Sequence, residues 1–167
     1  SSWRKIGDDV ITGVVGGRGA EPQLKVMKET ASALGLKLLE VGSASDAEKL
    51  VDAFRVAVRE QVNAILPVSG PVIFAQRKSI VVLAGNHKLP AIHPDKEFVE
   101  DGGLMSYGLD RRHQYRRAAD YVDKILRGAR PADLPVERPI KVEFYANLRA
   151  AKQIGLTIPP NVLVRAD

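Results

Sequence analysis

The fold is decided in residues 10–41, which read VITGVVGGRGAEPQLKVMKETASALGLKLLEV. The first six residues are mostly β-branched and run into a glycine pair, a pattern that is typical of a strand followed by a turn. Residues 21–34 then carry apolar side chains at helical spacing, with Pro22 suited to a first turn and Gly35 to a helix end. A second apolar run at 36–41 predicts the next strand, so the stretch is a strand–helix–strand unit.

The same alternation continues to about residue 93. A helix is expected after Ser45 and Asp46, either of which is suited to cap it. Residues 62–68 predict a third strand, 72–87 a helix and 90–93 a short fourth strand. Because parallel strands need such crossover helices, we expect an α/β fold: a three-layer, open, mostly parallel sheet with helices on both faces.

The last third of the chain has a different organisation. A short strand over 104–108 precedes a helix over 110–126 that is apolar on one face. After a proline-stiffened linker, alternating residues from Val136 onward predict a half-exposed strand. Asn147 is suited to cap a final short helix. The tail at 158–164 is not expected to be helical at its two consecutive prolines.

Composition narrows the function classes. The 167 residues carry a net charge of +5 and no cysteine, which excludes disulfides, thiolate metal sites and a cysteine nucleophile. The positive excess is local, since residues 110–130 hold seven Lys or Arg against three Asp; a nucleic-acid partner is therefore not expected. No stretch is apolar enough to span a membrane. Residues 1–6 lack the apolar segment of a secretory signal and are expected to be either an artificial boundary or an internal start of a mature chain.

Motifs for catalysis are incomplete. The glycine loop after the first strand matches only part of a dinucleotide fingerprint, because Pro22 stands where the third glycine belongs. Ser69 lies between Pro67 and Pro71, whereas a nucleophile elbow has glycine on both sides. The three histidines have no metal-ligand spacing. The sequence therefore predicts no catalytic residue, no metal site and no cofactor.

Several stretches nevertheless resemble one family. They are 88–93 (KLPAIH), 99–108 (VEDGGLMSYG), 115–137 (YRRAADYVDKILRGARPADLPVE), 147–159 (NLRAAKQIGLTIP) and 163–167 (LVRAD). They look like the solute-binding proteins of bacterial ABC transporters, in the tryptophan/tyrosine-type branch. The similarity is dense from about Ala84 to the end and looser from Val10 onward.

This resemblance implies one lobe of a two-lobed, type I periplasmic-binding fold. Residues 1–103 would form an α/β ligand-binding lobe, and 104–135 a hinge crossover with a helix that packs on the missing N-terminal lobe. Residues 136–167 would supply the return strand and C-terminal helix. Without the first lobe, the apolar face of the 110–127 helix is expected either to repack or to form a homodimer.

The resemblance also suggests binding residues. Ser69, Glu97 and Phe98 follow strand ends, where open α/β sheets bind ligands, and Tyr107 lies at the crossover. Arg18, in the glycine loop, is suited to pair with a solute carboxylate.

The implied function is that of the solute-binding component of a bacterial ABC importer, or the C-terminal lobe of one. It would bind a small-molecule solute, such as an amino acid, in an interlobe cleft and deliver it to an ABC permease in the membrane. A periplasmic or extracytoplasmic location is expected. The alternative is a ligand-sensing domain of a regulator or sensor with the same fold. A nucleotide-dependent enzyme is a third reading, which rests on the incomplete glycine loop.

Overall fold

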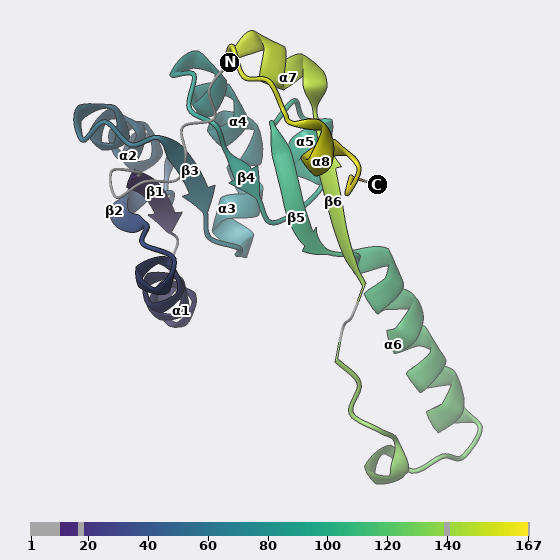
Figure 1. Ribbon diagram of the computed structural model, residues 1–167. Coiled ribbons are helices and arrows are strands. Elements are labelled where there is room, and N and C mark those ends of the chain that lie inside the picture. The colour runs from purple at the N-terminus through teal and green to yellow at the C-terminus, as the bar shows by residue number, and fades with distance from the viewer. Residues whose placement is uncertain (1–10, 17–18, 139–140, 167) are drawn as a thin grey trace.

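Figure 1 shows the computed structural model, which describes residues 11–16, 19–138 and 141–166. A body of strands and helices contains most of these residues, and one long helix extends away from it. None of the helices in the described part of the chain is both long and apolar enough to cross a membrane.

The body is built on six strands. In sheet order, the first three are β2 (Lys37–Ser43), β1 (Ile11–Gly16) and β3 (Ala64–Pro67). The other three are β4 (Ile92–His93), β5 (Met105–Leu109) and β6 (Val142–Ala146). A parallel bridge between Ile65 and Ala91 joins the two sets, with the Ile65 N–H donating to the Pro90 carbonyl at 2.8 Å. All neighbours pair in parallel except β5 with β6, so the sheet is open and mostly parallel.

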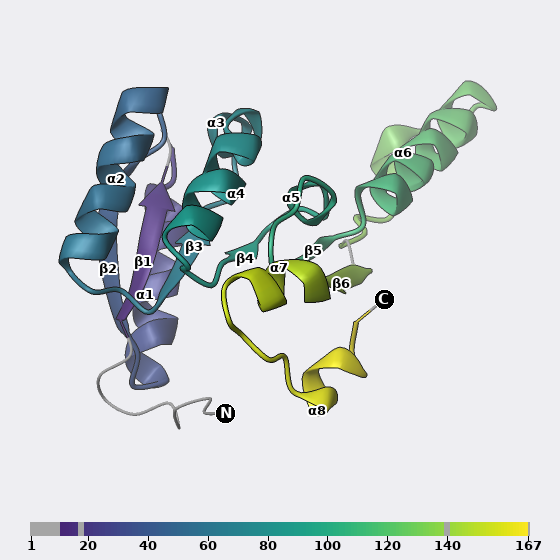
Figure 2. The ribbon, with the colours of Figure 1, turned by 90° about the horizontal axis from the view of Figure 1, so that it is seen from above.

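Helices cover both faces of this sheet. On one face lie α2 (Ala47–Arg59), α3 (Pro71–Ala75), α4 (Arg77–Asn86) and α5 (Glu97–Glu100). On the other lie α1 (Glu21–Ala33), α7 (Leu148–Gln153) and α8 (Pro160–Leu163) (Figure 2). The predicted three-layer α/β fold is confirmed.

The core follows from the amphipathic pattern of α2. Asp46 caps this helix by accepting a hydrogen bond from the Lys49 N–H at 2.8 Å, so Asp46 rather than Ser45 is the cap. Leu50 and Phe54, one turn apart, are fully buried against the sheet. Truncating a buried phenylalanine to alanine typically costs about 3–5 kcal/mol, so this helix is held mainly by its apolar face.

Three local predictions needed correction. The helix expected over 72–87 is divided at Gln76 into α3 and α4. The strand expected from Val136 begins only at Val142, and Val136 is 98% exposed. The tail does contain a helix, α8, because Pro160 occupies its first position, where the missing N–H breaks no helical hydrogen bond.

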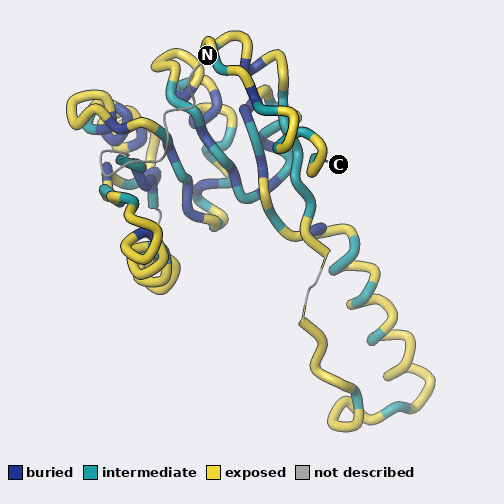
Figure 3. The backbone as a smooth tube through the Cα atoms, in the orientation of Figure 1, coloured by how far each residue is buried: buried dark blue, intermediate teal, exposed yellow. Residues whose placement is uncertain are grey.

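The long helix α6 (Arg111–Leu126) follows β5. Asp110 caps it through the His113 N–H at 3.0 Å. None of its residues is buried, and it projects beyond the sheet (Figure 3). It returns through a short 3₁₀ turn, η1 (Pro131–Asp133). We call residues 110–138 the arm. The expected repacking of its apolar face onto the body is not observed in the described residues.

Gly108 in β5 permits a close backbone approach. A side-chain methyl at this position would overlap the carbonyl oxygen of Pro94. We expect Gly108→Ala to lower the free energy of unfolding by about 2–4 kcal/mol, because only backbone movement relieves the overlap. Urea denaturation measures this change. Gly85→Ala is the control, since it adds a methyl to α4 where no atom lies within 4 Å; a similar loss in both variants would contradict the steric explanation.

His93, at the end of β4, is a buried titratable group. Its ring is 1% exposed and stacks on Phe98 with centroids 4.5 Å apart. Neither ring nitrogen has a hydrogen-bond partner among the described residues. Burial lowers the pKa of His93 from 6.5 to about 4, because the charged form loses its hydration.

Stability should therefore fall in acid. The unfolded chain takes up a proton on this histidine below about pH 6.5, whereas the folded chain does so only near pH 4. Between pH 7 and pH 5 we expect a loss on the order of 2 kcal/mol from this group. Replacing the ring by His93→Phe should remove that part of the pH dependence, measured by urea unfolding at both pH values. His87→Gln, at an exposed position, should leave the pH dependence of stability intact. An unchanged pH dependence in His93→Phe would show that other groups cause it.

Candidate functional site

The carboxyl ends of the parallel strands meet at one edge of the sheet. Val15 pairs with Pro67 near the ends of β1 and β3, and His93 pairs with Ser106 in β4 and β5. The loops that leave these ends therefore lie next to one another. In open α/β sheets this edge is where ligands bind.

An apolar groove of about 630 Å³ lies at this edge. We call it the carboxyl-edge groove. Its walls come from the start of α1, the end of β3, the end of β4 and the middle of β5. The lining residues are Pro22, Gln23, Val26, Met27, Leu66, Pro67, Val68, Ser69, Ile92, His93, Pro94 and Tyr107.

Two of the five predicted binding residues meet in this groove. Ser69 lies two residues beyond β3, and Tyr107 projects from β5 with 61% of its surface exposed. Neither hydroxyl forms a hydrogen bond with the described residues, so both are available to a ligand. A second, smaller hollow around the α3 start shares Ser69 and Val68 with the groove.

The other three residues are placed differently. Phe98 is 0% exposed and packs between His93 and Phe74; it is a core residue, and its expected contact with a solute is not supported. Glu97 lines a separate polar hollow of about 90 Å³ near the start of α6. Arg18 lies outside the described residues.

Sequence reasoning missed the contribution of α1. Gln23, Val26 and Met27 form one wall of the groove. Their position gave a usable signal, because α1 begins directly after the end of β1 and must start at the carboxyl edge. Met27 adds an adaptable apolar side chain, which suits a wall that fits itself to a ligand.

The groove is electrically neutral. Among its described lining residues there is no Asp, Glu, Lys or Arg, and His93 is uncharged near pH 7 because of its lowered pKa. No group of three or more metal-ligating side chains occurs in the described part of the chain. The groove can therefore offer apolar contact and neutral hydrogen bonds to a ligand, and it presents no assembled set of catalytic groups.

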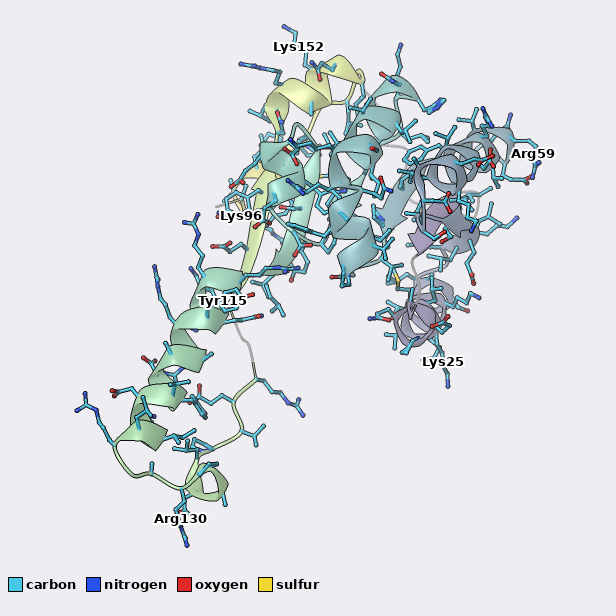
Figure 4. The ribbon with its side chains drawn as sticks, turned by 180° about the vertical axis from the view of Figure 1, so that it is seen from behind. Lys25, Arg59, Lys96, Tyr115, Arg130 and Lys152 are labelled. Carbon is cyan, nitrogen blue, oxygen red and sulfur yellow. The ribbon has the colours of Figure 1, made fainter. Side chains whose placement is uncertain are left out.

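Charged groups gather instead where the arm leaves the body. Asp110 accepts a hydrogen bond from the Lys141 side chain at 2.7 Å. This bond and that from the His113 N–H lower the pKa of Asp110 to about 2. Asp95, which follows β4, accepts from Arg111, the first residue of α6, at 2.8 Å. Figure 4 shows neighbouring Lys96 near the base of α6, where Tyr115 is also labelled.

Comparison with solved structures supports the fold. A conserved domain protein from Vibrio cholerae O1 biovar El Tor is 30% identical with a TM-score of 0.83, covering 93% of this chain and 53% of that one. An ABC domain from Streptococcus pneumoniae, solved with L-Trp, is 24% identical with a TM-score of 0.80, covering 94% and 55%. A ligand-free, open substrate-binding protein with adhesive properties from Clostridium difficile is 21% identical with a TM-score of 0.69, covering 91% and 52%.

The present chain thus spans about half the length of these three proteins. A search of curated proteins returned no significant match. The family model described as "ABC transporter substrate binding protein" matches residues 14–167, nearly the whole sequence. With this match, the α/β architecture and the groove at the carboxyl edge, the chain belongs to the ABC transporter substrate-binding protein family.

Proposed function

We propose that this chain is the C-terminal lobe, with its hinge arm, of the solute-binding component of a bacterial ABC importer. The observation that carries the proposal is the carboxyl-edge groove, which is apolar, open and formed by the ends of β3 and β4, the middle of β5 and the start of α1. A solute held there would need a second wall to exclude water. The family is one of transporter binding proteins, so the chain is not an enzyme. The same family match favours transport over the ligand-sensing alternative.

The second wall would be another lobe. The three solved chains are nearly twice as long as this one, which is the length that a second α/β domain requires. The arm leaves the body at the end of β5, beside Tyr107 of the groove. An uncovered helix at that position is suited to pack on a lobe facing the groove, and it is expected to do so in preference to forming a homodimer.

The proposed solute is a small metabolite with an apolar part, such as an amino acid with an apolar side chain. The neutral, apolar lining of the groove supports this class, because a charge placed against it would lose hydration without gaining a partner. The related Streptococcus pneumoniae domain was solved with L-Trp. Any charged groups of the solute would be held by other surfaces of the cleft. Closure around the solute outside the cytoplasm would then present it to a membrane permease.

Calorimetry on the full-length protein tests this function. We expect at least one apolar amino acid in a panel that includes L-tryptophan to bind. Tyr107→Ala should weaken that binding about 10- to 100-fold, since loss of a buried aromatic contact costs roughly 1–3 kcal/mol. Leu148→Ala is the control, because Leu148 is exposed on α7 and is not among the residues lining the groove. If no member of the panel binds, or if a solute is chemically converted, the proposal is contradicted.

A second variant tests the packing of α6. Val122 is 55% exposed in this chain. If the second lobe covers it, Val122→Asp should lower the free energy of unfolding of the full-length protein by about 2 kcal/mol or more, because a charge would be buried without a partner. The same change at the equally exposed Leu148 of α7 should cost less than about 0.5 kcal/mol. Equal, small effects of both variants in urea denaturation would show that α6 is uncovered.

A further inference from the structure

The direction of the arm is fixed at its base. Within the described residues α6 buries no side chain, and it contacts the body through Arg111 at its base. A helix of 16 residues is about 24 Å long, and a tilt of roughly 10° at its base moves its far end by about 4 Å. Small changes at the base therefore become large displacements of whatever packs on the helix.

One ion pair joins the base of α6 to the segment after β4. The Asp95 Oδ1 accepts from Arg111 Nε at 2.8 Å and lies 2.7 Å from Nη2. The Asp95 side chain is only 8% exposed, so this pair is shielded from solvent screening on the carboxylate side. The Arg111 guanidinium also lies 5.5 Å from the ring centroid of Phe74 in α3. The first residue of α6 is thus held by two separate segments of the body.

A second ion pair joins the same base to the returning chain. Asp110 accepts from Lys141 Nζ at 2.7 Å, and its own N–H donates to the Lys141 carbonyl at 3.0 Å. Lys141 directly precedes β6, which pairs antiparallel with β5. The two chain segments that connect the arm to the body are therefore held to each other at the point where both leave the sheet.

We propose that Asp95 and Asp110 are positioning residues, whose pairs with Arg111 and Lys141 set the angle between α6 and the sheet and so the orientation of the second lobe over the groove. We call the two pairs the hinge clasp. The inference rests on the proposed function, in which α6 packs on that second lobe. The clasp limits how far the lobes separate and in which direction they close. The ligand therefore meets two walls that are already partly aligned, which reduces the ordering that binding must impose.

The experiment measures the orientation of the arm directly. This chain has no cysteine, so Arg130→Cys and Lys152→Cys introduce spin-label sites at the far end of the arm and on α7, which lie far apart (Figure 4). Pulsed electron–electron distance measurements on the full-length protein, with no solute added, give the distribution of label separations. The parent should show a narrow distribution. Asp95→Asn combined with Asp110→Asn should at least double its width, and each single change should give a smaller increase.

Asparagine keeps the size of each carboxylate side chain, and it still caps a helix at position 110. The matched control is Asp123→Asn, which removes a carboxylate from an exposed pair, at 2.9 Å, with Arg127 at the C-terminal end of α6. Its distribution should equal that of the parent. The midpoint of thermal unfolding, measured on each labelled variant, should stay within a few degrees, which separates loss of positioning from loss of folding.

An unchanged width in the double variant would overturn the clasp, and so would equal broadening in Asp123→Asn. Because no solute is present, this result does not depend on whether the panel yields a ligand. Failure of the proposed function would instead appear as an absence of solute binding, and Val122→Asp would leave the free energy of unfolding unchanged.

Discussion

A parallel bridge between Ile65 and Ala91 joins the two halves of the sheet. Ile65 donates its N–H to Pro90 and pairs in parallel with Ala91, whereas β1–β3 and β4–β6 are otherwise separate three-stranded sets. The groove depends on this junction, because Ser69 belongs to the first set and Tyr107 to the second. Ile65 is fully buried, with residues of α2 and α4 in the same core cluster. Packing above the sheet thus compensates for the short pairing between the halves.

Uncharged and charged side chains occupy different parts of the molecule. Apolar and neutral groups line the groove, while Asp95 and Asp110 form ion pairs with Arg111 and Lys141 at the base of the arm. This separation has a physical reason. A solute with an apolar part gains from a surface that loses little hydration on contact, whereas a hinge gains from charged hydrogen bonds, which are directional and stronger than neutral ones. Recognition and orientation are therefore carried by different kinds of interaction, a few residues apart in the chain.

The candidate site shows where sequence reasoning succeeds and fails. The family resemblance suggested Ser69, at a strand end, and Tyr107, at the crossover, as binding residues, and the structure places both on the groove. Phe98 was suggested in the same way, yet its ring stacks on His93 in the core; the position after a strand does not say which side of a helix faces inward. The ion pairs were not foreseen, since Asp95 and Arg111 are 16 residues apart and Asp110 and Lys141 are 31 apart. No local periodicity links residues at such separations.

The sequence alone was enough to predict the layered α/β fold, the cap at Asn147 and the apolar stripes, because these depend on short-range spacing and on the chirality of crossover connections. It also carried the family resemblance. Folding in three dimensions settled which strand-end residues share a groove, that this groove is uncharged, and that α6 contacts the body at its base through Arg111 while burying none of its own residues. These features depend on how the two halves of the sheet meet and on long-range charge pairs, and neither is encoded in the pattern of any single segment.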